Sequence, residues 1–220
     1  MYRFITVIIF TAFAVTCQLG CGTPVRELTW DDLIPHEILS DDPLKGLNDE
    51  QRNAANWVVY MLENLPERNS ESEEIYLMVD EAIPEFKEAG IDIAEIMEKR
   101  NKLYTSVVHE LSGQQISIPG YLLPLEMSDS MVTEFFLVPY IGACIHVPPP
   151  PPNQILHVTV TNEKGYKSSA LYDPVMVTGV IRVESAVKEL FLVDGSDDID
   201  TGYALEATEI KPYEIDYQDL

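Results

Sequence analysis

A run of five consecutive prolines is the feature that most restricts how this chain can fold. It occupies residues 148–152, and as a polyproline II rod it would be about 15 Å long, at about 3.1 Å per residue. Proline has no backbone N–H group, so the run cannot lie inside a β-sheet. We therefore expect a rigid loop, whose stiffness lowers the entropic cost of ordering the residues on either side.

The residues around the proline run have the composition of short strands. From residue 105 to 215, Val, Ile, Thr and Tyr are frequent, and Gly and Pro separate the alternating segments. The strands that we expect are residues 115–123, 132–138, 141–147, 155–160, 175–183 and 203–210. Short strands with glycine bends predict a small OB-like antiparallel β-barrel.

Helical periodicity marks residues 49–104, upstream of the strands. Asn48 and Gln51 have the spacing of a capping box, which predicts that the first helix begins at residue 49. Pro84 is expected to interrupt the second helix, and Asp92 is expected to cap the third. Glu and Lys fill the other helix faces and predict a solvated surface. The predicted fold class is α+β, with a helical N-terminal region followed by the barrel.

Residues 21–48 contain several prolines and are expected to form an extended tether. Trp30, Leu33 and Ile34 form an apolar patch within it. We expect this patch to dock on the body of the protein.

Residues 1–20 have the features of a signal peptide of the lipoprotein type. The apolar stretch over residues 5–15 is too short to span a bilayer comfortably. Cys21 is the predicted lipidated residue, although Gln18 stands where bacterial lipoprotein signals usually carry Leu. Lipidation at Cys17, ordinary cleavage and a retained anchor are alternatives. The predicted location is the periplasmic side of the bacterial envelope, held by the lipid anchor only, or soluble in the periplasm.

The charge of the chain excludes one class of function. The sequence carries 14 Lys and Arg residues against 37 Asp and Glu residues, a formal net charge of −23. Non-specific nucleic-acid binding needs a basic surface that displaces counterions, so we expect no nucleic-acid partner. The acidic run at 194–200 lacks the glycine and the bidentate glutamate of an EF-hand and is expected to be a solvated loop.

The residues that flank the prolines suggest a metal site. Cys144 and His146 would share one face of a strand, because side chains alternate along it. If the segments on either side of the prolines pair symmetrically, residue 144 faces His157 and residue 146 faces residue 155. A thiolate and two imidazoles suit zinc, or copper in its reduced form. Glu126 or Glu134 could supply a fourth ligand.

Three alternatives to a metal site remain open at this point. Cys144 can be a core residue, with His146 hydrogen-bonded and His157 an ordinary strand residue. Cys144 can be part of a catalytic thiol pair, although no third orienting group is identifiable. The loop can instead be a docking ridge for a protein partner. The residues of that ridge are Tyr140, Pro148, Pro149, Pro150, Pro151, Pro152, Asn153 and Gln154.

Three segments of the chain resemble a known family. They read GYLLPLE at 120–126, VTEFFLVPYIGACIHVPPPPPNQILHV at 132–158 and PVMVTGVIRV at 174–183. They are similar to the DUF3299 family of bacterial periplasmic proteins and lipoproteins, a family of unknown function. The resemblance covers about residues 105–215, and its signature residues are Cys144, His146, the prolines, Asn153 and Gln154.

The resemblance implies a role accessory to metal handling or to an ABC-type transport system. The implied partners are ABC transporter components or a periplasmic metal-binding protein. No catalytic residue is carried over. We therefore expect a non-catalytic envelope binding protein with its site at the loop 144–157.

Overall fold

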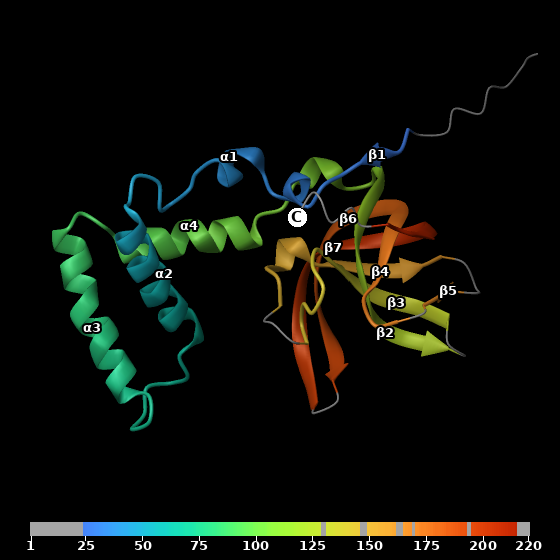
Figure 1. Ribbon diagram of the computed structural model, residues 1–220. Helices are drawn as coiled ribbons and strands as arrows, with labels where there is room; N and C mark the ends of the chain where they lie inside the picture. Colours follow the sequence, from blue (N-terminus) through green and yellow to red (C-terminus); the bar gives the residue numbers. More distant parts are fainter. Residues whose placement is uncertain are drawn as a thin grey trace, which may run out of the picture.

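Helices come first along the chain and strands second, so the fold class is α+β (Figure 1). The structure, a computed structural model, describes residues 24–128, 131–145, 149–161, 165–168, 170–192 and 195–214. The helices are η1 (Asp31–Leu33), α1 (His36–Leu39), α2 (Asp49–Asn64), α3 (Glu73–Glu88), α4 (Ile93–Thr105), η2 (His109–Leu111) and η3 (Pro152–Gln154). The strands are β1 (Arg26–Glu27), β2 (Gln115–Ser128), β3 (Met131–Val138), β4 (Leu156–Val160), β5 (Tyr166–Lys167), β6 (Asp173–Leu192) and β7 (Gly195–Pro212).

The helices α2, α3 and α4 pack around a core of their own, which includes Val58, Val79 and Ile96. The capping box at the start of α2 is present, because Asn48 Oδ1 accepts from Gln51 N at 2.9 Å and Asn48 N donates to Gln51 Oε1 at 3.2 Å. Asp92 caps α4 as predicted. The predicted break at Pro84 is wrong, since α3 continues through it to Glu88.

Five strands form a closed circuit of hydrogen-bonded pairs. β2 pairs with both β6 and β3, and the circuit continues from β6 through β7 and β4 back to β3. The sheet is mixed, because β4 pairs with β7 in parallel and the short β1 pairs with β2 in parallel. The prediction of a wholly antiparallel sheet is therefore wrong at these two pairings. β4 runs in the same direction as β2, because β3 is antiparallel to both. β7 also runs in the direction of β2, because β6 is antiparallel to both. The pair of β4 and β7 is therefore parallel.

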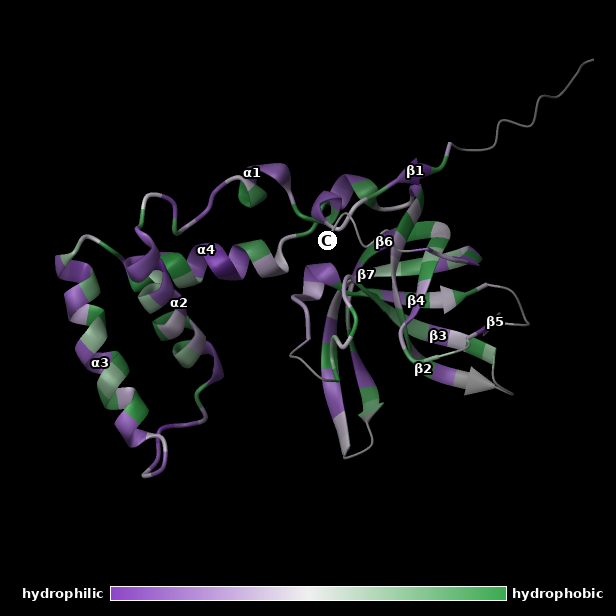
Figure 2. Ribbon diagram, viewed as in Figure 1, coloured by the Kyte–Doolittle hydropathy of each residue, from purple (hydrophilic) through white to green (hydrophobic). Residues whose placement is uncertain are grey.

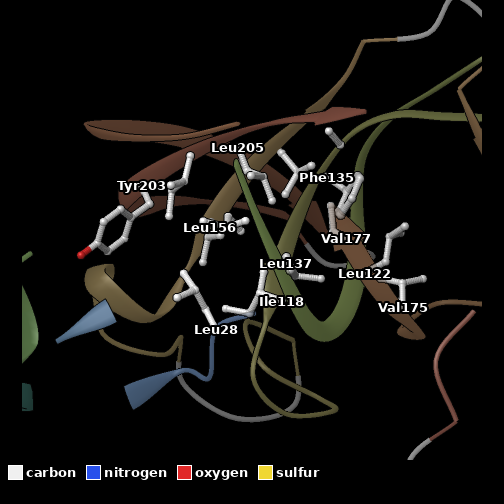
Figure 3. Close-up of a cluster of buried hydrophobic side chains, with 14 of the residues drawn as sticks. Leu28, Ile118, Leu122, Phe135, Leu137, Leu156, Val175, Val177, Tyr203 and Leu205 are labelled. Carbon is white, nitrogen blue, oxygen red and sulfur yellow. The ribbon is translucent and has the colours of Figure 1, made fainter. Parts of the chain in front are cut away.

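The main core lies inside the circuit. On β4, the alternation of the strand buries Leu156, Val158 and Val160 on the inner side. The other inward side chains come from β2, β3, β6 and β7, and Figure 3 shows them converging. The same alternation is visible along the strands when they are coloured by hydropathy (Figure 2).

β6 and β7 continue beyond the circuit as a long hairpin. We call the paired residues 186–192 and 195–201 the arm, which extends toward the lower edge of Figure 1. Irregularities of register at Thr178/Gly179 and at Val183/Ala186 bend the two strands. The predicted solvated loop at 194–200 is therefore wrong, since β7 begins at Gly195.

A second core lies between the arm and the outer face of β2 and β3. It contains Leu190 and Ile199 from the arm and Phe136 from β3. The segment 139–155, which joins β3 to β4, contributes further buried residues to it, among them Ala143, Cys144 and Ile155. The arm is thus fixed to the rest of the strands by apolar contacts on one of its faces.

The tether docks on the strands. Leu33 is fully buried in the main core, and Trp30 packs against that core. Trp30 Nε1 donates to Pro119 O at 2.9 Å, and Gln154 Nε2 donates to Trp30 O at 3.0 Å. The hydroxyl of Tyr203 donates to Leu33 O at 2.7 Å, and it points out of the core in Figure 3.

Within the residues that the structure describes, no helix is both long enough and apolar enough to cross a membrane. The predicted lipidation site Cys21 lies outside those residues.

Candidate functional site

The sequence predicted a strand at 141–147, and the described part of it, residues 141–145, forms turns instead. Its described residues turn at Gly142 and Cys144, which both have left-handed backbones with φ of +87° and +66°. The symmetric pairing about the prolines is also wrong. β3 and β4 pair with Leu137 opposite Leu156 and with Phe136 opposite His157. His146 and Pro148 lie outside the described residues.

The side chain of Cys144 is a buried thiol in the second core, 7% exposed. Burial and the nearby carboxylate of Asp197 raise the pKa of this thiol to about 11. The thiolate is the form that attacks electrophiles and binds metals, and at neutral pH Cys144 is almost wholly protonated. The position therefore favours a structural role over a catalytic one.

His157 does not face Cys144 across a strand pair; it contacts Glu134 on β3. His157 Nε2 lies 2.5 Å from Glu134 Oε1, and Lys188 Nζ from the arm lies 2.9 Å from the same oxygen. Burial opposes ionisation of this carboxyl, but the Lys188 ammonium and the His157 ring together hold its pKa below the usual range. The three side chains connect the arm to the outer face of β3 and β4.

The remaining predicted ligand, Glu126, is exposed and stands opposite Glu134 in the β2–β3 register. Among the described residues, no group of three or more His, Cys, Asp and Glu side chains is close enough to hold a metal ion. Of the predicted ligands that the structure describes, His157 and Glu134 are the pair in contact.

Asn153 and Gln154 point into the protein. Asn153 is fully buried, and its Nδ2 donates to Leu103 O at 2.7 Å and to Ser106 O at 2.8 Å. These carbonyls belong to the C-terminal end of α4, where backbone acceptors lack partners within the helix. Gln154 donates to Trp30 O in the tether. Both amides therefore join the helical region and the tether to the strands.

The prolines that the structure describes are only partly available to a partner. Pro149 is exposed, Pro150 is buried, and Pro151 and Pro152 are half-buried. Tyr140 and Ile141, which precede them, are 42% and 65% exposed.

Leu171 is a further large apolar residue with an exposed side chain, 53% exposed. The next residue, Tyr172, donates its hydroxyl proton to Ala143 O, so the segment around residue 171 is held against 139–145. We call the consecutive exposed residues Tyr140 and Ile141 the apolar surface. It lies beside the second core and is the exposed apolar part of the candidate site.

Sequence reasoning missed the arm and with it Lys188 and Asp197. One signal was available, because the dipeptide Asp194-Gly195 is typical of tight hairpin turns. The many acidic residues in 194–200 favoured the interpretation as a solvated loop, so the strand that begins at Gly195 was not predicted.

A cavity of about 500 Å³ lies elsewhere, between the tether and residues 107–110. His36, His109 and carboxylates such as Glu37 and Glu110 line it. It contains none of the predicted metal ligands and none of the residues of the predicted docking ridge.

Comparisons with known proteins identify the family. No curated protein matches the chain. A crystal structure of a DUF3299 family protein from Pseudomonas aeruginosa PAO1 is 30% identical in sequence, and the match covers 88% of this chain and 99% of that one with a TM-score of 0.47. The model of the family described as "Protein of unknown function (DUF3299)" matches residues 30–212. The chain belongs to the DUF3299 family.

Proposed function

We propose that this protein is a non-catalytic binding protein of the bacterial envelope that docks a protein partner through the apolar surface. The observation that carries the proposal is the division of segment 139–155. Among the residues of this segment that the structure describes, Cys144, Asn153 and Gln154 serve internal contacts, whereas Tyr140 and Ile141 remain exposed. Large apolar side chains that cluster on a surface are typical of protein interaction sites.

An OB-like barrel is part of the proposal. The closed circuit of β2, β3, β4, β7 and β6 supports it, because an OB fold is a five-stranded Greek-key barrel. Ligands of OB folds bind the face of the second and third strands, which corresponds here to β3 and β4. The second core occupies part of that face with the protein's own residues. This coverage favours a partner that binds the covering segment over a small ligand that enters the face.

The chemistry of the nearby groups supports binding over catalysis. The Cys144 thiol is protonated at neutral pH, and the His157 ring is engaged with Glu134. A thiol nucleophile needs an adjacent base that is free to accept its proton. Neither residue has the setting that thiol catalysis requires.

The proposed partner is a component of an ABC-type transport system or a periplasmic metal-binding protein, as the family resemblance implies. A photoactivatable amino acid at position 141 of the full chain, in living cells, tests the proposal. We expect a cross-linked product with such a partner that is lost when Tyr140 is changed to Ala. The matched control carries the photoactivatable residue at position 77 on α3, where Leu77 is 49% exposed. The same product from positions 77 and 141 would contradict the proposal.

The zinc or copper site at Cys144, His146, His157 and Glu126 remains a prediction. The donors that the structure describes fit it poorly, because Cys144 is protonated and Glu126 is exposed on the solvent side. Metal content measured by mass spectrometry on untagged protein, beside Cys144→Ser and His157→Gln, tests it. Near-stoichiometric metal that disappears in both variants would establish the site.

The lipid anchor is proposed from the sequence of residues 1–21. Cys21→Ser is expected to move the protein from the membrane fraction to the soluble periplasmic fraction. A variant that stays in the membrane fraction would contradict lipidation at this residue.

A further inference from the structure

We propose that the open edge of β6 in the arm binds an extended, basic segment of a protein, which adds to the arm as a further strand. The inference rests on the proposed partner-docking function and gives the chemistry of the segment that is bound. Strand addition supplies affinity through main-chain hydrogen bonds and specificity through side-chain pairing.

The first observation is that β6 loses its neighbour on one side. Its pairing with β2 ends at Val180 opposite Gln115. Backbone hydrogen bonds of Ile181 with residues 113 and 114, and one from Val183 N to the Ser112 hydroxyl, extend that edge slightly. From residue 184 to 191, β7 is the strand that pairs with β6 among the residues the structure describes. The open edge is about 27 Å long, at about 3.4 Å per residue.

The second observation is that the arm is already ordered. Leu190 and Ile199, each 2% exposed, fix its inner face to the second core. Lys188 adds the contact with Glu134. A strand that adds to this edge does not have to order the arm, so the entropic cost of binding is lower than for a mobile hairpin.

The third observation is the apolar content of the outer face. Val187 and Phe191 lie on that face of β6 and are 60% and 74% exposed. Both positions have the parity opposite to the buried Leu190, which places them away from the second core. Proteins usually protect an edge strand with charged side chains, bulges or a covering element. Glu184, Lys188 and Glu189 supply charge on this strand, whereas the exposed valine and phenylalanine are apolar area that an added strand can cover.

The fourth observation is charge. Residues 184–200 carry six acidic residues, namely Glu184, Glu189, Asp194, Asp197, Asp198 and Asp200. The only basic residue in this range is Lys188, whose ammonium already contacts Glu134. Asp198 and Asp200 stand opposite Glu189 and Val187 in the β6–β7 register. A second copy of this chain, with its net charge of −23, is repelled by this edge, and a basic strand is attracted to it.

A synthetic peptide of alternating Lys and Val residues is the probe, and its counterpart with Glu in place of Lys is the peptide control. Fluorescence anisotropy with the full chain is expected to show saturable binding of the basic peptide only, weakened by added salt. Hydrogen exchange is expected to slow at the amides of residues 184–191. Phe191→Ser should weaken binding about tenfold, through loss of a cross-strand pair, and the pair Glu189→Lys with Asp198→Lys should abolish it.

Matched controls lie on α3, away from the strands. Leu77→Ser and the charge reversals Glu81→Lys and Glu85→Lys change exposed residues of the same types and should leave binding unchanged. All the substituted positions are exposed, so the variants are expected to fold. Thermal unfolding checks that they do.

Four outcomes would overturn the inference. They are no saturable binding of the basic peptide, equal binding of the acidic peptide, binding without protection of residues 184–191, and a dimer in sedimentation that Phe191→Ser dissociates. If the cross-link from position 141 persists in Phe191→Ser while the peptide fails to bind the unmodified protein, the inference fails and the proposed function stands. If that cross-link fails while the peptide binds at the arm, the proposed function fails instead.

Discussion

Cys144 combines a left-handed backbone with a buried, protonated thiol. Its pKa of about 11 leaves roughly a thousandth or less of the thiol ionised near neutral pH. We expect iodoacetamide to modify Cys144 at least about a hundredfold more slowly in the folded protein than in urea. Mass spectrometry of the peptide that contains Cys144 measures this rate without interference from the other cysteines. Rapid labelling of the folded protein would show instead an exposed, activated thiol and would revive thiol chemistry.

Glu134 is the residue on which the contact between the arm and β3 depends. Glu134→Gln removes the charge that Lys188 and His157 contact, and it should destabilise the protein by about 1–3 kcal/mol at pH 7. The pKa of this carboxyl is lowered in the folded state, so its contribution is present above the unfolded value of about 4.5. The contribution is lost as the pH falls through the lower, folded value.

Urea unfolding of Glu134→Gln and of the unmodified protein, at pH 7 and at about pH 3, measures how the contribution of Glu134 to the free energy of unfolding changes with pH. The gap between Glu134→Gln and the unmodified protein should narrow at the lower pH. Glu126→Gln, on the exposed residue directly opposite, is the matched control and should change the free energy of unfolding by less than about 0.5 kcal/mol. An equal loss at both pH values would show that the charge of Glu134 is not what stabilises the arm.

The sequence predicted those site residues that lie on the two adjacent strands β3 and β4, and it failed for the residues of the turning segment between them. His157 and Glu134 were both candidate ligands, and they do meet, because Phe136 opposes His157 and residue 134 is its diagonal neighbour on the same face. The place of Cys144 depended on how the chain turns between β3 and β4. Periodicity does not define the left-handed turns at Gly142 and Cys144, so the assumed pairing placed Cys144 wrongly.

At the scale of elements, the arm depends on a bend that begins at Gly179. A Cβ atom at this position would lie 2.2 Å from Glu206 O, a backbone atom of the neighbouring strand β7. Gly179→Ala therefore forces β6 and β7 apart at the irregularity in their register. We expect a loss of about 2–3 kcal/mol in the free energy of unfolding, measured in urea.

Val187→Ala, on the exposed face of the same strand, is the control for Gly179→Ala. It should cost less than about 0.5 kcal/mol. Equal stability of the two variants would mean that β6 and β7 can separate at Gly179 without loss, and that the close approach does not fix the bend.

Elements that are defined by local signals could be predicted from the sequence. The helices α2 and α4 begin where Asn48 and Asp92 cap them, because a cap acts on the backbone of its own first turn. The predicted break at Pro84 was wrong because proline removes one backbone hydrogen bond locally, whereas the packing of α3 around Val79 stabilises the whole helix. The length of β6 and β7 depends on pairing with each other and on burial of Leu190 and Ile199, neither of which appears in composition.

At the scale of the whole molecule, three segments far apart in sequence meet at the hydroxyl of Tyr203. It donates to Leu33 O in the tether at 2.7 Å and accepts from Val108 N, between α4 and β2, at 2.6 Å. The sequence predicted that the patch around Leu33 docks, because an apolar patch in a tether must be buried somewhere. It did not predict the position of docking, since a single hydroxyl that joins residues 33, 108 and 203 leaves no periodic signal.

Tyr203→Phe tests whether this hydroxyl connects the regions of the molecule. The change keeps the ring in the main core and leaves Leu33 O and Val108 N without their partner, which should cost about 2–4 kcal/mol in the free energy of unfolding. Hydrogen exchange should accelerate at the amide of Val108 and across residues 30–34. The amides that pair β6 with β7 should keep their protection. Tyr213→Phe, on a tyrosine that is 37% exposed, is the control and should change neither stability nor exchange. Uniform acceleration over all strands would show that Tyr203 supports the core as a whole, whereas acceleration confined to the tether and residue 108 would show that its hydroxyl holds the N-terminal segments on the strands.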